Sequence, residues 1–439
     1  MTQARTICLG FLILITLGTI LLLLPYSNAD RQIGNFLISL FTATSAVCVT
    51  GLSVVVINEY FSTFGQVIIL VLIQLGGLGY MTSSSFLIFM LGGKFSVKQR
   101  FNISESLSLT HTNELKHFIM NVILLTLVIE VLGVILLFPV FLEKYDFLYS
   151  LWLAIFFSIN AFNGGGLSLF HDSLEHFNSW AIYIIIPSLV IIGGIGYNVL
   201  EEVYYNLKRI LRHKRVNFSL HSKVVFVVTS VLLLTGTVGF YFFEDNHAFA
   251  HLDTTYKILS AWFQSVTTRS AGLSTIPQAS LNSSSLLLTV VLMFIGASPG
   301  GTGGGIKTTT VWVLAAASYA ALRGRSKVVS FGREIPNLNI LRAVSIVFGS
   351  LAMVSVVAIL ISHLNQELSF IYILYEVFSA FGTVGLSCGI TENLDSISQL
   401  LLVFTMFVGR INIIILMSAL IGGEKPSLVN YPEEKLLIG

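Results

Sequence analysis

The sequence predicts an all-α polytopic membrane protein in which four parallel repeats surround one central pore, each repeat a helix, a pore loop and a second helix. Two observations lead to this fold class. Of the 439 residues, 54% are hydrophobic and only 10% are charged, against about 25% charged residues in a soluble domain. The tripeptide Gly-Leu-Ser also occurs four times, beginning at Gly51, Gly166, Gly272 and Gly385, at intervals of 115, 106 and 113 residues. Such spacing in an apolar chain indicates internal repeats.

Long apolar segments flank each of these glycines in pairs, and a shorter one precedes the glycine itself. Crossing about 30 Å of hydrocarbon takes about 20 residues, and segments of that kind cover residues 7–24 and 67–91, 118–140 and 180–200, 224–243 and 286–322, and 343–361 and 400–420. The shorter segments share an aromatic residue ten positions before the glycine, namely Phe41, Phe156, Trp262 and Tyr375. Each second long segment carries glycines that predict a break, near Gly76, Gly193, Gly296 and Gly409. A signal peptide is the alternative for the first apolar segment, but the repeat requires a retained helix.

The charges predict that all four repeats have the same orientation. Lys and Arg accumulate in cytoplasmic loops, and 18 of the 24 basic residues lie near the chain ends or in the loops that join one repeat to the next. Parallel repeats can close around an axis along the membrane normal. We therefore predict repeats at residues 1–95, 115–207, 222–323 and 340–421, a cytoplasmic tail at 422–439, and both termini in the cytoplasm of a multi-pass protein of the cell membrane.

Acidic residues fall mainly on the opposite, outer side, Glu244 and Glu376 among them. An acidic mouth attracts cations, although acids that only solvate loops are an equally good explanation. There is no sign of nucleic-acid binding, and the lipid bilayer is the expected surrounding.

The segments that lead to the four glycines have the character of an ion filter. A loop at membrane depth persists only when it is buried in protein or lines a water-filled path. None of the four contains a carboxylate, so backbone carbonyls must be the main ligands, as in potassium filters. Glycine permits the backbone conformations that this requires. The predicted ion-binding residues are Cys48, Val49, Thr50, Gly51, Asn163, Gly164, Gly165, Gly166, Ser270, Ala271, Gly272, Thr383, Val384 and Gly385.

The same segments carry a family resemblance that covers nearly the whole chain. The matching residues are Val49-Thr50-Gly51-Leu52, Ala161-Phe162-Asn163, Arg269-Ser270-Ala271-Gly272, Phe381-Gly382-Thr383-Val384-Gly385-Leu386, Gly303-Gly304-Gly305-Ile306-Lys307 and Phe407-Val408-Gly409-Arg410. In these the chain resembles the Trk/Ktr/HKT superfamily of potassium transporters, and within it the Ktr membrane subunits (KtrB). It departs at Cys48, where threonine is common, and at Asn412-Ile413, where Gly-Pro is usual.

The resemblance implies potassium uptake by a homodimer. It also implies a KtrA-like octameric ring of cytosolic regulatory subunits that binds the regulatory nucleotide, so no cofactor is expected on this chain beyond K⁺. Whether Na⁺ is also bound and drives uptake stays open. A sodium-permeable transporter of the same fold is the alternative; in the family, serine in place of Gly51 accompanies sodium permeation. An enzyme is disfavoured because no aspartate lies in the core of a span.

A gate is predicted in the third repeat, where glycines and a proline interrupt the second helix at residues 296–305, too many helix breakers for a continuous helix. Packing through small residues is the alternative explanation. Ile306 separates Gly305 from Lys307, so the segment lacks the Gly-Lys-Ser/Thr of a phosphate loop. By resemblance, the gate residues are Gly300, Gly301, Thr302, Gly303, Gly304, Gly305, Lys307 and Arg410.

Two arginines at membrane depth need an explanation. A charge at the centre of an apolar helix costs at least about 2.5 to 3.5 kcal/mol, and Arg410 lies in such a helix. By resemblance it lies beside the glycine loop and opposes cations; a structural partnership with a buried acid such as Glu130 is the alternative. We expect Arg269 to pair with acids behind the filter, since a cation pointing into the filter would repel the ion.

Overall fold

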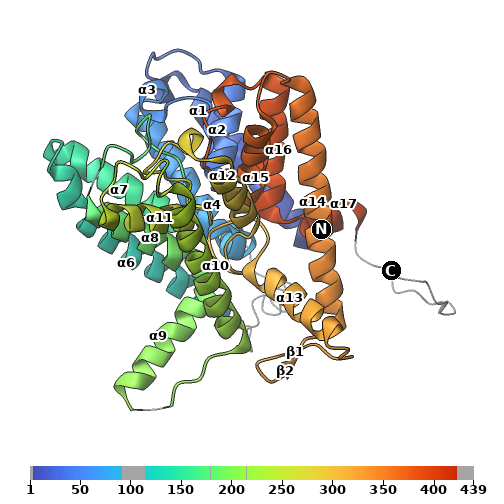
Figure 1. Ribbon diagram of the computed structural model, residues 1–439. Coiled ribbons are helices and arrows are strands. Elements are labelled where there is room, and N and C mark those ends of the chain that lie inside the picture. The colour runs from blue at the N-terminus through green and yellow to red at the C-terminus, as the bar shows by residue number, and fades with distance from the viewer. Residues whose placement is uncertain (1–2, 91–113, 178, 214, 423–439) are drawn as a thin grey trace.

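The computed structural model describes residues 3–90, 114–177, 179–213 and 215–422 (Figure 1). These residues are mostly helical, and the only strands described are a short antiparallel hairpin of β1 (Val329–Ser330) and β2 (Arg333–Glu334). The predicted tail lies outside the described residues except for Gly422.

One long helix opens each repeat: α1 (Gln3–Leu23), α6 (Glu114–Leu142), α10 (Leu220–Glu244) and α14 (Asn337–Leu364). Among the described residues these four helices are long and apolar enough to cross a membrane. Large apolar side chains on their outer faces are exposed, for example Phe242 and Phe348, which lipid rather than water would cover.

A shorter, more deeply buried helix follows in each repeat: α2 (Phe36–Cys48), α7 (Phe147–Asn163), α11 (Thr254–Thr267) and α15 (Phe370–Gly382). Each starts at a residue that suits a helix N-cap, namely Asn35, Asp146, Asp253 and Ser369. We call these four the pore helices. Short turns flank the pore helices: η1 (Pro25–Ser27) precedes α2, whereas α3 (Ile57–Tyr60), η2 (Gln278–Ser280) and η3 (Thr391–Asn393) follow α2, α11 and α15.

The second long helices differ among the repeats. In the first repeat, α4 (Thr63–Met90) is continuous, so the predicted glycine break at Gly76 is wrong. In the second, α8 (Trp180–Ile195) and α9 (Tyr197–Leu211) bend by 101°. In the third, a loop separates α12 (Ser283–Phe294) from α13 (Thr308–Leu322). In the fourth, α16 (Ser396–Ile411) and α17 (Ile413–Ile421) bend by 95°.

Three of the repeated glycines, Gly76, Gly193 and Gly409, mark close approach to a pore helix rather than a bend. A Cβ on Gly76, Gly193 or Gly409 would collide with the carbonyl oxygen of Val47, Phe162 or Phe381, at the end of the pore helix of the same repeat. The bends themselves occur a few residues later, at Gly196 and Asn412, where φ is 102° and 80°. Glycine thus lets each pore helix end against its second helix.

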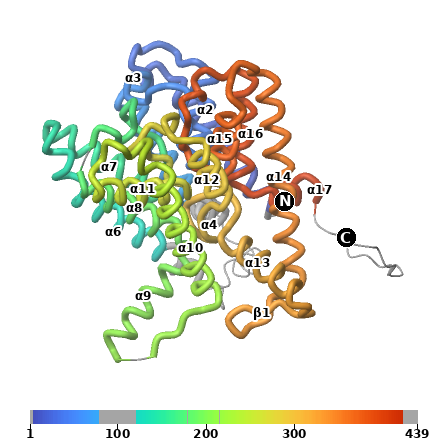
Figure 2. The backbone as a smooth tube through the Cα atoms, in the orientation of Figure 1, coloured from blue at the N-terminus to red at the C-terminus, as the bar shows by residue number. Residues whose placement is uncertain are grey.

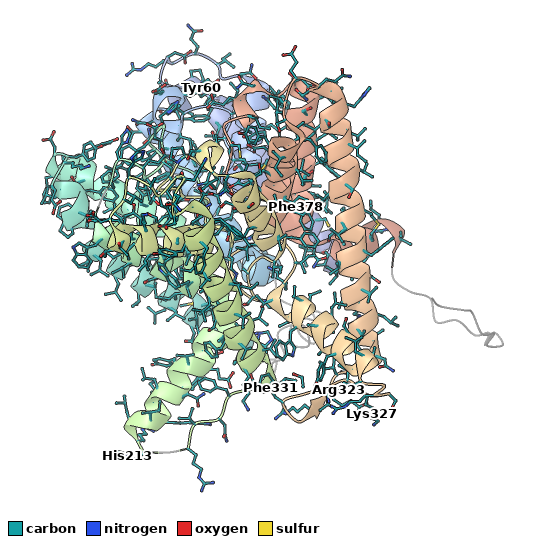
Figure 3. All side chains as sticks on the ribbon, in the orientation of Figure 1. Tyr60, His213, Arg323, Lys327, Phe331 and Phe378 are labelled. Atoms are coloured by element: carbon teal, nitrogen blue, oxygen red, sulfur yellow. The ribbon has the colours of Figure 1, made fainter. Side chains whose placement is uncertain are left out.

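Figures 1 and 2 show α11, α12 and α15 in the middle of the molecule, with α6 and α14 at opposite edges. The helix α3 lies at one end, and α9 and the β1–β2 hairpin lie at the other. Figure 3 labels Arg323 and Lys327 beside this hairpin, which is not predicted within the basic loop between the third and fourth repeats. Its turn packs on α13: the rings of Trp312 and Phe331 stack with centroids 5.7 Å apart, and Trp312 Nε1 donates a 2.8 Å hydrogen bond to Ser330 Oγ.

Candidate functional site

The four glycines of the repeated tripeptide meet in a ring. A Cβ added to Gly51 would lie 2.6 Å from the Cα of Gly166, one on Gly166 would lie 3.1 Å from that of Gly272, one on Gly272 would lie 3.1 Å from that of Gly385, and one on Gly385 would lie 2.8 Å from that of Gly51. All four have φ between 70° and 98°. Both the space and the backbone therefore exclude a side chain at each of these positions.

The residue two positions before each glycine is also left-handed. Val49, Gly164, Ser270 and Thr383 have φ values of 56°, 70°, 68° and 48°. For β-branched valine and threonine this conformation is rare, and strain of that kind costs on the order of 1–3 kcal/mol. Four equivalent residues share it, so the pore loops have one common backbone path.

This path turns the N–H groups toward the pore helices. The N–H groups of Thr50, Gly165 and Val384 donate to carbonyls inside their own pore helices, at 2.8, 2.8 and 2.9 Å. Those of Gly51 and Gly385 donate to the hydroxyls of Ser45 and Ser379, each at 3.0 Å.

The carbonyls of the same segments project toward the neighbouring loops. A Cβ on Gly166 would lie 3.1 Å from Thr50 O, and one on Gly272 would lie 2.5 Å from Val384 O. Ser270 O and Gly165 O likewise approach Gly164 and Gly51. Uncharged oxygens converging on one axis suit a partly dehydrated monovalent cation.

Cys48 and Asn163 occupy a different place from the other predicted ligands, because each is the last residue of its pore helix. The Asn163 side chain points away from the ring, and its Nδ2 donates to Gln74 Oε1 at 2.8 Å and to Glu130 Oε1 at 3.0 Å. Gln74 Nε2 also donates to Glu130 Oε2 at 3.3 Å. The Glu130 carboxylate is thus hydrogen-bonded where the second pore helix meets α4 and α6.

An open cavity of about 450 Å³ lies on the side of the ring that is predicted to face outward. The four glycines form its floor, and His171, Asp172, Glu175 and Glu392 contribute to its walls. A hydrogen bond of 2.6 Å between His171 Nδ1 and Asp172 raises the pKa of His171 above its ordinary value. Burial and the nearby charge of Asp172 raise the pKa of Glu175 to about 7.

Two acids predicted for this mouth are buried instead. Glu376 is 1% exposed, and its carboxylate accepts hydrogen bonds from Ser387 Oγ at 2.5 Å, Cys388 N at 3.1 Å and Thr391 Oγ1 at 3.0 Å. Glu244, fully buried, accepts from Asn282 N at 3.0 Å. Both hold outer loops in place rather than attract ions, as an acid with backbone N–H partners can.

The loop at 296–305 lies on the inner side of the ring and contacts other repeats. In the second repeat, Thr302 N donates to Gly193 O at 3.2 Å, and Gly300 O accepts from Tyr197 N at 3.0 Å. In the fourth, Gly304 N donates to Thr383 Oγ1 at 2.8 Å. Residues 300–308 are all buried. The segment is therefore an ordered loop, and it lies directly against Thr383, one of the predicted filter residues.

Buried cations surround this loop. Arg410, 2% exposed, donates from Nη1 to Thr302 O and from Nη2 to Gly76 O. Lys307 Nζ donates to Gly303 O at 2.6 Å. The expected acid partner of Arg269 is absent from the described residues; its Nη2 donates to Gly296 O at 3.3 Å instead.

The polar residues inside the pore helices are not among the residues predicted from the sequence. Ser45, Asn160 and Ser379 stand six positions before a ring glycine, and each binds a backbone group of the loop that follows its helix. Their signal is a polar residue recurring at one position of an otherwise apolar helix.

The chain is similar in sequence to known cation transport proteins. The family model "TrkH: Cation transport protein" matches residues 4–425. The chain is 34% identical to the potassium/sodium uptake protein NtpJ of Enterococcus hirae, covering 100% of this chain and 98% of that protein. It is 35% identical to the Ktr system potassium uptake protein D of Bacillus subtilis (100% and 98%) and 33% identical to the Ktr system potassium uptake protein B of Vibrio alginolyticus (100% and 95%).

Among solved structures, the crystal structure of the potassium transporter TrkH from Vibrio parahaemolyticus has a similar fold, with a TM-score of 0.67. It is 18% identical in sequence, and the match covers 93% of this chain and 84% of that one.

Proposed function

Since the chain belongs to the TrkH family of cation transport proteins, we propose that it takes up potassium across the cell membrane through the ring of four pore loops. The family places it among multi-pass membrane transporters and outside the enzymes. The observation that carries the proposal is the ring itself. Its four glycines have left-handed conformations, carbonyl oxygens of the loops lie close to the glycines of neighbouring loops, and N–H groups of the loops donate to the pore helices. Potassium is the preferred ion because the relatives are named potassium uptake proteins.

The loop 296–305 acts as the gate of this pore. It lies against Thr383 on the inner side of the ring, and glycines give it several backbone arrangements of similar energy. Two such states separated by a few kcal/mol are what a gate requires. The guanidinium of Arg410, bonded to the loop at Thr302 O, adds a positive charge that opposes cations in this low-dielectric region.

Sodium permeation by the same pore is the second candidate function, because one relative is named a potassium/sodium uptake protein. Gly51 favours potassium. At a φ of 98° and in close contact with Gly166, a side chain at this position would disturb the ring of carbonyls, and glycine has none.

The partners follow from the same premise. We expect a homodimer and, on the cytoplasmic face, an octameric ring of KtrA-like regulatory subunits that carries the regulatory nucleotide. The end that holds α9 and the β1–β2 hairpin is the cytoplasmic one, because Arg323, Arg325, Lys327 and Arg333 gather there. The acidic outer cavity then faces the medium.

Growth rescue tests the proposal. Cells that lack potassium uptake would express this chain in potassium-limited medium, with and without added sodium. We expect rescue by the wild-type chain, weakened when Gly51 is replaced by serine. Absence of rescue by protein that is present in the membrane would contradict potassium uptake, and rescue only with sodium would establish coupling to that ion.

A further inference from the structure

Thr383 takes part in both the filter and the gate. Its backbone, at a φ of 48°, leaves the fourth pore helix α15 and enters the pore loop. Its hydroxyl oxygen accepts a 2.8 Å hydrogen bond from the N–H of Gly304 in the loop 296–305. Both residues are buried. One side chain thus joins the ring of carbonyls to the loop beneath it.

The equivalent residues of the other repeats do not make such a hydrogen bond. Val49 and Gly164 have no hydroxyl. The Ser270 side chain lies close to Gly303 of the loop, but its Oγ donates to Gly382 O of the neighbouring fourth repeat at 3.0 Å. Of these four equivalent residues, Thr383 is therefore the one whose side chain is hydrogen-bonded to the loop 296–305. Thr383 is also strained by its left-handed backbone conformation, whereas Gly164, its equivalent in the second repeat, is not. Strain retained at one position is consistent with a role there.

The fit between Thr383 and Gly304 is close. A Cβ on Gly304 would lie 2.5 Å from Thr383 Oγ1 and 2.7 Å from Thr383 Cγ2, so only glycine can occupy this place while the loop is seated. The next N–H of the loop, that of Gly305, makes a longer bond of 3.3 Å to Gly409 O. The Gly304–Thr383 bond is the shorter of these two attachments to the fourth repeat.

We infer that Thr383 couples the filter to the gate, an inference that rests on the proposed function. Its hydroxyl holds Gly304, and with it the loop, in the blocking position. A change in the backbone of Thr383, such as occupancy of the filter would cause, is transmitted to the loop through this bond. Thr383 is thus a positioning residue for the gate as well as a contributor of a filter carbonyl.

Substitutions that separate the hydroxyl from the backbone test this role. Thr383→Val keeps the β-branched shape and its backbone strain but leaves the buried N–H of Gly304 without an acceptor, whereas Thr383→Ser keeps the hydroxyl. In vesicles with the purified chain, we expect Thr383→Val to raise potassium flux per folded molecule about tenfold, which corresponds to about 1.4 kcal/mol in the gate equilibrium. Thr383→Ser, which keeps the acceptor for Gly304 N, should raise the flux less than Thr383→Val does.

Unchanged flux in Thr383→Val, or a changed ion ratio without a gain in flux, would overturn the inference. If that variant does not fold, Gly304→Ala and Thr383→Ala supply a double-mutant cycle on the same contact. Each should raise flux, and the double variant should raise it no further; multiplying effects would refute the coupling. Gly51→Ser, measured in the same assay, separates failure of this inference from failure of the proposed function. If Gly51→Ser changes the ion ratio but the Thr383 variants have no effect, only the inference fails. If neither has an effect, the proposed function fails as well.

Discussion

Replacing Gly51 by serine is expected to weaken the preference for potassium over sodium by about tenfold, or about 1.4 kcal/mol. The new Cβ would lie 2.6 Å from Gly166 Cα and 2.8 Å from Gly166 C, where ordinary contacts begin at 3.4 Å, so one loop must move by about 0.8 Å. The φ of 98° adds backbone strain on the order of 1–3 kcal/mol. The shift displaces Thr50 O and Gly165 O, two oxygens of the ring.

The assay is the flux of K⁺ and of Na⁺ into vesicles that contain equal amounts of folded protein. Gly324→Ser is the matched control, because Gly324 also has a positive φ, 63°, but no atom lies within 4 Å of its added Cβ. That variant should keep the wild-type flux ratio. An unchanged ratio in Gly51→Ser would refute the placement of Gly51 in the filter, and an equal change in Gly324→Ser would show that backbone strain alone is responsible.

Further predictions concern the gate, the mouth and the outer loops. Arg410→Ala should raise potassium flux, because it removes a buried positive charge beside the loop; folded protein with no gain in flux would favour a structural role. Shortening the loop 296–305 should give a pore that leaks without a regulatory partner, and a folded variant that stays fully dependent would place the gate elsewhere. The hydrogen bond to Asp172 raises the pKa of His171. Acidifying the outer medium therefore adds positive charge at the mouth and should slow potassium uptake at low salt. His171→Gln should make the dependence of uptake on pH weaker. Glu376→Ala should destabilise the protein by about 1–3 kcal/mol for each buried donor left unpaired. Glu376→Gln, which still accepts hydrogen bonds, should lower the midpoint temperature of thermal unfolding by less than Glu376→Ala does.

The repeat pattern predicted the architecture because the requirement for glycine at a position depends on its local backbone conformation and is therefore visible in the sequence. A position that requires a positive φ and has no room for a Cβ accepts glycine alone, so Gly51 and its three equivalents stand out in register. The loop 296–305 is visible for the related reason that its composition cannot sustain a helix.

Other features depend on packing between distant segments, which one sequence does not display. The glycines of α4 resemble those of the bent helices, but they accommodate the carbonyl of Val47 without any bend. From the sequence alone, Glu376 is predicted to line the outer mouth. In the structure, hydroxyls at residues 387–391 donate hydrogen bonds to its buried carboxylate. The bend at Asn412 follows from asparagine's tolerance of positive φ, with its side chain capping Ile414 N at 3.3 Å.

The ring of four pore loops is the central claim, and locating a bound ion tests it most directly. Thallium or rubidium substitutes for potassium and scatters strongly, so the purified protein would be crystallised or frozen in either salt. We predict density on the axis inside the ring of Gly51, Gly166, Gly272 and Gly385, within bonding distance of carbonyl oxygens such as Thr50 O. Ion density at another place in the protein, with none inside this ring, would contradict the account.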